Sequence, residues 1–330
     1  MKNIKYTILF LQPIVKTKLW AGNKLSKKIK NYGANVGEVW LCSALADNSN
    51  IITNLSQKVS LQQFWLEHKG YFGFADHINN YDQDFPLLVK FIDAGDNLSV
   101  QLHPNYKNQE QKYLNKNEAW YIIDCANNGE IIYGHNANNL AQFQQYVANA
   151  DYSILFNLVK IANGQVWYIP SGSLHAIMAD TLILEVQQPS DITYRLYDYD
   201  RLDHDGKLRQ LHLAEVEKHL SYNQQELRRL QQRSYQTLSI ISNQLQLLLS
   251  NNYFSIYRVV VYGNFILAAT KQFYCLQILS GSGQFLVKDN NNENMLYNVR
   301  VGESILILNT VKSITIMGYM MIMLESPLLL

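Results

Sequence analysis

The sequence predicts a mainly β protein with helical insertions, built from two β domains that are joined by a helical connector. Three observations lead to this expectation. The chain has 330 residues, more than one small core needs, and that length suggests about two domains. Short alternating or apolar stretches, separated by turns rich in Gly, Asn and Pro, recur along most of the chain, as is typical of strands. A charged segment with helical spacing, 211–232, stands between the two β-rich parts.

The first domain is expected to cover residues 1–234, and the second residues 235–330. Two features interrupt the β pattern of the first domain. Ser60-Leu-Gln-Gln63 is a capping-box pattern, which opens a short helix that reaches about His68. Residues 138–160 have helical spacing and few β-branched side chains until their end, so they predict a helical insertion.

The second domain is predicted to be all-β, made of many short strands. Gly281-Ser-Gly283 and the polar run 289–294 are expected as turns, and Gly302 and Gly318 as breaks between strands. This part of the chain contains no histidine. It therefore cannot repeat a histidine metal site, and a structural role is expected for it.

Composition limits the partners of the chain. The formal net charge is +1 and 48% of the residues are hydrophobic, which argues for packed cores and against a nucleic-acid or membrane-surface partner. The cysteines Cys42, Cys125 and Cys275 are scattered and odd in number, which favours a reducing compartment. The apolar patch Tyr6–Leu11 is too short for a signal peptide, and no run approaches the ~18 apolar residues of a membrane helix. We expect a cytoplasmic protein, either a monomer or a weak dimer.

The stretch from Asn97 to His103 divides into two faces when it is interpreted as a strand, because side chains alternate with period two. One face is apolar and points into a core: Leu98, Val100 and Leu102. The other face is polar and forms a row: Asn97, Ser99, Gln101 and His103. A half-buried strand with a hydrated outer face would also show this alternation. A site inside a barrel is the alternative hypothesis.

Three further segments carry candidate functional groups. A strand from Gly164 runs into a Pro170 and Gly172 turn and emerges at His175. The segment 116–123 is strand-like, with one face made of these side chains: Lys116, Glu118, Trp120 and Ile122. Lys90 lies within an apolar run, where an ammonium is costly unless it finds an anion or water. It either reaches the surface or awaits an anionic substrate.

Two of these stretches together resemble the cupin signature, a metal-binding motif of jelly-roll β-barrels. The first half is Gly95-x5-Gln101-x-His103, with Gln101 in the place of the usual first histidine, and the second half is Gly164-x5-Pro170-x-Gly172-x2-His175. The candidate glutamate, Glu118, comes fifteen residues after His103 rather than a few, as if a segment were inserted.

The insertion and the glutamine are similar to those of the type I phosphomannose isomerases, in their shorter bacterial branch. The resemblance covers most of residues 13–210 and rests on these stretches: Pro13…Leu19-Trp20-x-Gly22, Gly37-Glu38-x-Trp40, Lys90-Phe-Ile-Asp93-Ala, Leu98-Ser-Val-Gln-Leu-His-Pro104, Lys116-x-Glu118-x-Trp120-Tyr, Pro170-x-Gly172-x-x-His175-Ala and Leu184-Glu-x-Gln-Gln188…Ser190-Asp191-x-x-x-Arg195-x-Tyr-Asp-Tyr-Asp-Arg201.

The resemblance implies two cupin domains and an enzyme of mannose metabolism that interconverts mannose 6-phosphate and fructose 6-phosphate through a metal-stabilised enediol. It implies one Zn²⁺ per chain, held by Gln101, His103, Glu118 and His175. It places Arg195 in the active site to stabilise the intermediate. Further residues are expected near the reacting carbons: Lys90, Lys116, Glu185 and Asp191. Ser99 and Arg201 match positions that hold the sugar phosphate, a dianion suited to a hydroxyl and a guanidinium.

Some alternatives stay open on the sequence alone. The acid–base group is either Asp191 or a metal-bound water. Taken singly, His175 is a surface histidine, Glu118 a solvated carboxylate, and Arg195 with Asp191 a plain ion pair, but their shared order and spacing favour the metal site. Two other functions compete. An iron-dependent cupin dioxygenase would favour more histidines in its site, and Gln101 argues against it. A non-enzymatic sugar-sensing cupin would not need Lys90 and Arg195 beside a metal.

Overall fold

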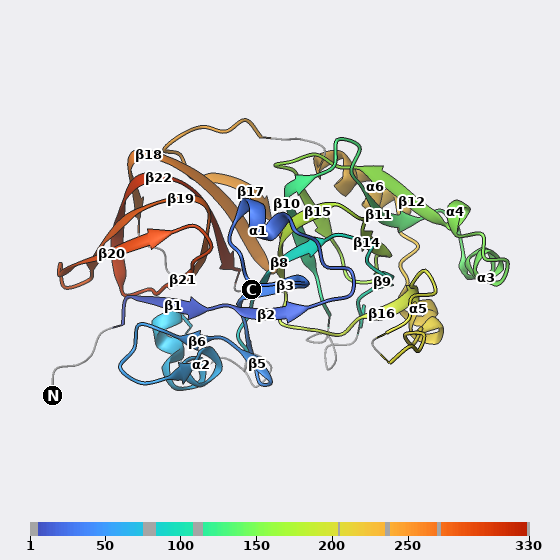
Figure 1. The fold of residues 1–330 in the computed structure, drawn as a ribbon, viewed down its shortest axis with the longest axis horizontal. Helices are drawn as coiled ribbons and strands as arrows, with labels where there is room; N and C mark the ends of the chain where they lie inside the picture. Colours follow the sequence, from blue (N-terminus) through green and yellow to red (C-terminus); the bar gives the residue numbers. More distant parts are fainter. Residues whose placement is uncertain are drawn as a thin grey trace.

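A computed structural model describes residues 6–74, 84–107, 115–203, 205–234, 238–268 and 272–328. The chain is mainly β, as predicted. Three large sheets of nine, six and five strands are arranged along the molecule (Figure 1). A two-stranded ribbon, β4 (Ala44–Leu45) with β5 (Asn48–Ser49), lies outside them.

The six- and five-stranded sheets face each other and enclose the site. The six-stranded sheet consists, in spatial order, of β13 (Val166–Ile169), β10 (Glu118–Cys125), β15 (Thr181–Gln187), β8 (Leu88–Ala94), β3 (Val36–Cys42) and β2 (Ile14–Thr17). The five-stranded sheet consists of β12 (Phe156–Lys160), β11 (Glu130–His135), β14 (His175–Ile177), β9 (Val100–Leu102) and β16 (Tyr194–Tyr197).

The nine-stranded sheet contains the C-terminal strands and also three short strands from the start of the chain. In spatial order its strands are β17 (Gln246–Ser250), β18 (Phe254–Ala268), β22 (Val311–Pro327), β19 (Tyr274–Asp289), β21 (Ser304–Ile307), β1 (Ile8–Gln12), β6 (Ile51–Ile52) and β7 (Val59–Ser60), with β20 (Asn294–Arg300) paired to β19. The first and last strands of the described residues, β1 and β22, therefore lie in the same sheet.

Short helices cover the edges of the sheets. They are α1 (Lys24–Lys28), α2 (Leu61–His68), a 3₁₀ turn at Lys69–Phe72, α3 (Leu140–Ala148), α4 (Tyr152–Leu155), α5 (Leu213–His219) and α6 (Gln224–Ser234). The predicted cap is confirmed, because the Ser60 side chain accepts a hydrogen bond from the Gln63 backbone N–H at the start of α2. No helix within the described residues combines the length and apolar character that a bilayer crossing requires.

Three apolar layers hold the sheets together. Trp120, Tyr133 and Trp167 belong to the layer between the six- and five-stranded sheets. The other face of the six-stranded sheet packs on the nine-stranded sheet through a second layer, which includes Phe91 and Phe273. A third layer lies within the curved C-terminal sheet. Because both faces of the six-stranded sheet are covered, every residue of β8 is buried, including its lysine.

The C-terminal strands differ from the prediction of many short strands. β18, β19 and β22 span 15, 16 and 17 residues, and the expected turn at Gly281–Gly283 and break at Gly318 both lie inside strands. Gly318 has φ +133°, and a Cβ there would approach the Ser282 carbonyl oxygen to 2.5 Å. Glycine therefore bends these strands where the sequence pattern suggested that they end.

Two other predictions are corrected or fall outside the described residues. The helical insertion predicted over 138–160 contains α3 and α4, but its last five residues form β12, which pairs with β11. The β-branched Val159 is buried there against the sheet, so tertiary packing outweighs the helical spacing. The polar stretch 105–117 is expected from its composition to be a helix or a long loop, and its residues 108–114 lie outside the described part.

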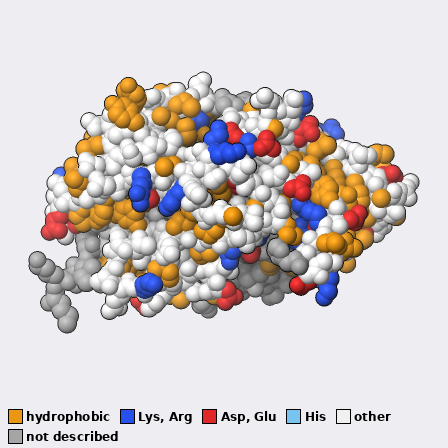
Figure 2. Space-filling model, viewed as in Figure 1, with side chains coloured by type: hydrophobic (Ala, Val, Ile, Leu, Met, Phe, Trp, Pro, Cys, Tyr) orange, Lys and Arg blue, Asp and Glu red, His pale blue; other side chains and the backbone are white. Residues whose placement is uncertain are grey.

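Charged side chains of both signs are interspersed on the surface. Figure 2 shows Lys and Arg side chains lying among Asp and Glu on the face that it presents. This distribution agrees with the net charge of +1. Most charges of the site described next are instead buried.

Candidate metal centre

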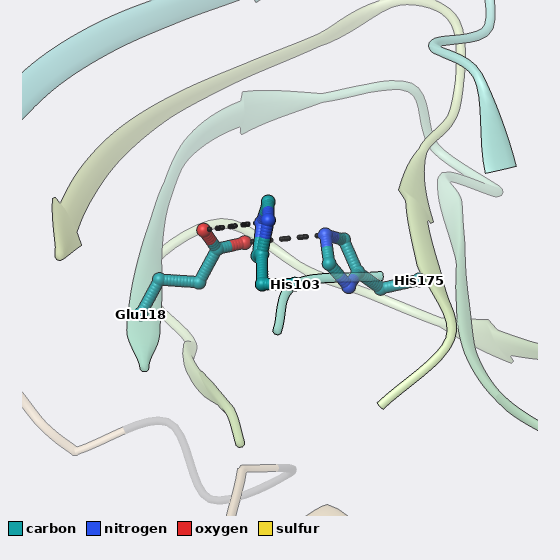
Figure 3. Close-up of side chains that lie close together, drawn as sticks. All are labelled: His103, Glu118 and His175. Carbon is teal, nitrogen blue, oxygen red and sulfur yellow. Dashed lines mark ion pairs between the residues drawn. The ribbon is translucent and has the colours of Figure 1, made fainter. Parts of the chain in front are cut away.

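Three potential metal ligands come together from three separate segments. His103 directly follows β9, Glu118 begins β10 and His175 begins β14, and each is only 1% exposed. The Glu118 carboxylate faces both imidazoles, as Figure 3 shows. Its Oε2 lies 3.1 Å from His103 Nε2 and its Oε1 lies 3.4 Å from His175 Nε2. The ligand atoms of all three residues lie within 4.8 Å of one another.

The backbone fixes this arrangement locally. Gly172 has φ +80°, and a Cβ there would lie 2.6 Å from the His219 carbonyl oxygen, so only glycine fits this turn. Its N–H donates to the His103 carbonyl oxygen at 3.0 Å, which ties the turn before His175 to the end of β9. Gln101 lies opposite His175 in the β9–β14 register, so the predicted fourth ligand is on the strand beside it.

The hydrogen bonds of the two imidazoles define their tautomers. His103 Nδ1 lies 2.9 Å from the Ile192 carbonyl oxygen, and His175 Nδ1 lies 2.9 Å from the Ser173 carbonyl oxygen. A carbonyl oxygen can only accept, so in each ring Nδ1 carries the proton and donates. The Nε2 atoms then carry lone pairs that face the centre, as in histidines that bind metals. Lys116 Nζ donates to His103 Nε2 at 3.1 Å.

The ionisation states also suit a cation. Burial lowers the pKa of His175 to about 3 and also lowers the pKa of His103, so both rings are neutral at pH 7. Burial alone would raise the pKa of Glu118, but Lys116 and the imidazoles outweigh it and hold that pKa well below its usual value. His175 Nε2 is buried without a hydrogen-bond partner among the described residues. Two neutral imidazoles, a carboxylate and an unsatisfied lone pair fit a zinc ion.

A row of four side chains crosses the six-stranded sheet beside this group. The strand registers align Trp40 with Lys90, Lys90 with Glu185, and Glu185 with Trp120. Lys90 Nζ lies 3.7 Å from Glu185 and 4.5 Å from the centre of the Trp40 ring. The Trp120 indole N–H donates to Glu185 at 3.1 Å. Lys90 is 4% exposed, so it does not reach the surface and its charge stays inside.

The other predicted charged residues surround the same space. Lys116 Nζ lies 2.8 Å from Glu118 Oε2, and although burial lowers the pKa of Lys116, Glu118 and Glu185 raise it above its usual value. Burial and then the charge of Glu118 raise the pKa of Glu185 to about 7. The Asp191 carboxylate lies 3.6 Å from Lys90 Nζ, and its side chain is 59% exposed. The row itself is buried, and Asp191 links its lysine to solvent.

The predicted phosphate-binding residues are Ser99, near Gln101, and Arg201, in the loop that follows β16, and the predicted active-site residue Arg195 lies on β16. The Ser99 hydroxyl donates to the Gln101 amide oxygen at 3.0 Å. Arg195 is opposite Gln101 in the β9–β16 register and donates to the Gln210 carbonyl oxygen at 2.8 Å. Arg201 comes after β16 and binds the Asp198 carboxylate at 2.8 Å.

Sequence reasoning missed the residues that support these groups. Trp40 packs on Lys90 and donates its indole N–H to Glu38 at 2.7 Å. The charges of Lys90 and Lys18 outweigh the effect of burial and lower the pKa of Glu38 to about 2. Glu38 and Trp40 are two residues apart on β3 and so lie on one face of the strand, which was the signal in the sequence that could have identified them. Arg209 had no such signal, because its contact with Asp198 depends on the loop between them.

Curated proteins and a solved structure resemble the chain over most of its length. It is 34% identical to mannose-6-phosphate isomerase ManA of Bacillus subtilis, covering 89% of this chain and 94% of that protein. It is 33% identical to mannose-6-phosphate isomerase of Streptococcus mutans, covering 92% of this chain and 93% of that protein. The crystal structure of a mannose 6-phosphate isomerase from Bacillus subtilis superposes with a TM-score of 0.81 at 28% identity, covering 97% and 99% of the two chains.

A more distant structure has the same fold. The crystal structure of a mannose 6-phosphate isomerase bound with zinc and yttrium matches with a TM-score of 0.73 at 15% identity, covering 98% of this chain and all of that one.

The antiparallel sheets and the buried His–Glu–His group define a metal-binding protein with a cupin-like fold. The family model described as phosphomannose isomerase type I, catalytic domain, matches residues 8–145. With relatives above 30% identity over most of its length, the chain belongs to the type I phosphomannose isomerase family.

Proposed function

We propose that this chain is an isomerase that interconverts mannose 6-phosphate and fructose 6-phosphate, with one zinc ion held by Gln101, His103, Glu118 and His175. The observation that carries the proposal is the buried group in which two imidazole Nε2 atoms and the Glu118 carboxylate converge. The family relatives that bear this activity in their names support it. Neither the dioxygenase nor the sugar-sensing alternative has such support.

The reaction moves a proton between C1 and C2 of the sugar through an enediol, and its barrier is the negative charge that builds on the sugar oxygens. A bound zinc ion would supply positive charge to those oxygens. We assign a share of the same task to the ammonium of Lys116 and the guanidinium of Arg195, because preorganised cations in a dry site stabilise developing charge. Lys116 lies in the centre of the site, with its ammonium 2.8 Å from Glu118 Oε2 and 3.1 Å from His103 Nε2.

The proton transfer is assigned to the group formed by Lys90, Glu185 and Asp191. The Lys90 ammonium lies 3.7 Å from one carboxylate and 3.6 Å from the other, so the three can exchange a proton with a substrate held above them. A general acid–base works best when its pKa lies near the working pH. The pKa of about 7 for Glu185 meets that condition.

Purified protein tests the proposal directly. Mannose 6-phosphate is supplied, and formation of fructose 6-phosphate is followed by a coupled assay before chelation, after chelation and after zinc is returned. We expect activity that disappears with the metal and returns with zinc. An absence of turnover in every condition would favour a sensor. Full turnover with no metal by elemental analysis would exclude the metal from the mechanism.

The wider organisation is proposed on similar grounds. A division at about residue 234 separates a catalytic cupin domain from a C-terminal β domain, with α5 and α6 as the connector. β1 pairs with β21 and so would cross the division. Cys42, Cys125 and Cys275 are free thiols, which supports the proposal of a reducing, cytoplasmic compartment.

A further inference from the structure

Two arginines that are separated in the sequence lie together, and one of them, Arg201, is a predicted phosphate-binding residue. After β16 the chain turns back on itself, and a β-bridge joins Leu202 to Leu208 in antiparallel fashion. The residues that flank this bridge, Arg201 and Arg209, are therefore brought opposite each other. The turn before it needs unusual backbone, because the non-glycine residues Tyr199 and Asp200 have φ values of +57° and +52°.

One buried carboxylate holds both guanidinium groups. Arg209 binds Asp198 with two donors, its Nε at 2.6 Å from Oδ2 and its Nη2 on Oδ1. Arg201 Nη2 donates to the same Oδ1 at 2.8 Å. Burial would raise the pKa of Asp198, but the hydrogen bonds from the two arginines outweigh it and lower that pKa. The carboxylate is thus ionised and orients both cations.

The cluster has more positive charge than its own acids balance. Arg195 is close enough to Arg209 and Arg201 that, after burial, their charges contribute to lowering its pKa. Two carboxylates oppose these three guanidinium groups. Asp198 is buried, whereas the Asp96 side chain is 66% exposed and lies 3.8 Å from Arg201 Nη1. Arg201 Nη1 and Arg195 Nε are buried without hydrogen-bond partners among the described residues. An excess of cations with unused donors is what a phosphate dianion requires.

We propose that Arg209 is a phosphate-binding residue, which forms with Arg201 a pair of guanidinium groups held in place by Asp198. The bonds to Asp198 use Nε and Nη2 of each arginine, with Arg201 Nε on the Asp198 carbonyl oxygen at 3.3 Å. The Nη1 groups are then the donors that we assign to the oxygens of a substrate phosphate. The inference rests on the proposed function, since the ligand is the phosphate of the sugar substrate. In this inference Arg209 binds the phosphate and makes the site specific for a phosphorylated sugar, and it takes no part in the proton transfer.

The test compares Arg209→Ala and Arg209→Lys with a matched control, Lys207→Ala, which removes one positive charge from an exposed position of the same loop. Steady-state kinetics with mannose 6-phosphate give KM and kcat, and inorganic phosphate serves as the second probe, both as an inhibitor and in a thermal-shift titration. We expect Arg209→Ala to raise KM and the phosphate dissociation constant at least about ten-fold, or ~1.4 kcal/mol, with kcat changed less than about three-fold. Arg209→Lys should fall between, and Lys207→Ala should match the wild type within about two-fold.

The possible results separate the inference from the proposed function. If Arg209→Ala fails to fold, the test uses Arg209→Lys, provided that this variant has the melting temperature of the wild type. Unchanged KM and unchanged phosphate affinity in that variant, or a fall in kcat alone, would overturn the assignment. If the wild type binds inorganic phosphate through Arg209 but does not isomerise mannose 6-phosphate, the inference stands and the proposed function fails.

Discussion

Replacing His175 with alanine tests the metal centre most directly. The variant removes one imidazole whose Nε2 faces Glu118 at 3.4 Å. It also leaves a cavity at a buried position, which destabilises the protein whether or not a metal binds. The useful quantity is therefore the rise in melting temperature between chelator-treated and zinc-loaded protein, because the cavity affects both forms equally.

The expected size of this rise follows from ligand linkage. At a free zinc concentration about 1,000 times the wild-type Kd, binding stabilises the folded protein by ~4 kcal/mol. An unfolding entropy of ~2.1 cal/mol/K per residue converts that into a rise of about 6 °C for a chain of this length. Loss of a ligand should weaken the affinity at least about 100-fold. At the same zinc concentration the rise for His175→Ala should then be about 2 °C or less.

The assay needs three readings on each protein: melting temperature with and without zinc, zinc content by elemental analysis, and turnover of mannose 6-phosphate. His68→Ala is the control, because His68 lies on α2 among aromatic rings and outside the centre. We expect His68→Ala to keep the full zinc-dependent rise. Full zinc content, the full rise and full turnover in His175→Ala would show that this histidine is not a ligand.

Three further predictions test the charged row, a buried acid and a helix cap. Lys90→Gln should lower turnover at least about 100-fold while zinc content stays at the wild-type level, whereas the exposed Lys160→Gln should leave both unchanged; equal turnover in the two variants would contradict the assignment. Burial, and then the nearby Cys275, raises the pKa of Glu325 well above its usual value. As pH rises, the unfolded chain therefore loses this proton before the folded protein does. The free energy of unfolding should fall from about pH 4.5 towards the folded-state pKa, by up to ~1.4 kcal/mol per pH unit. Urea unfolding at several pH values should show that Glu325→Gln lacks this loss and that the exposed Glu293→Gln keeps it. If the free energy of unfolding depended on pH in the same way in both variants and the wild type, the assignment to Glu325 would be refuted. Ser60→Ala should lower the free energy of unfolding by ~1 kcal/mol, because a backbone N–H of α2 loses its acceptor; an unchanged urea midpoint would count against the cap.

The local sequence pattern was sufficient to predict those features of the site that depend on a single strand or turn. The alternation around Gln101 placed Leu98, Val100 and Leu102 in the core, where all three are buried, because strand geometry assigns neighbouring side chains to opposite faces. The Pro/Gly turn before His175 and the Ser60 cap were likewise readable, since each depends on a few consecutive residues. The pairing of His103, Glu118 and His175 came from the family resemblance and not from the pattern itself.

Strand pairing decided the rest, because contacts between distant segments depend on which strands are neighbours and in which register. Lys90 reads as a misplaced charge until β8 lies between β3 and β15, and then it has Trp40 on one side and Glu185 on the other. Arg209 reads as an ordinary surface residue until the loop folds back on Asp198. Gly281, Gly283 and Gly318 read as turns or breaks, because sequence shows their conformational freedom but not that β19 and β22 continue through them. By itself, therefore, the sequence determined the mainly β class, the helix cap and the faces of individual strands, while the tertiary structure decided which charges meet.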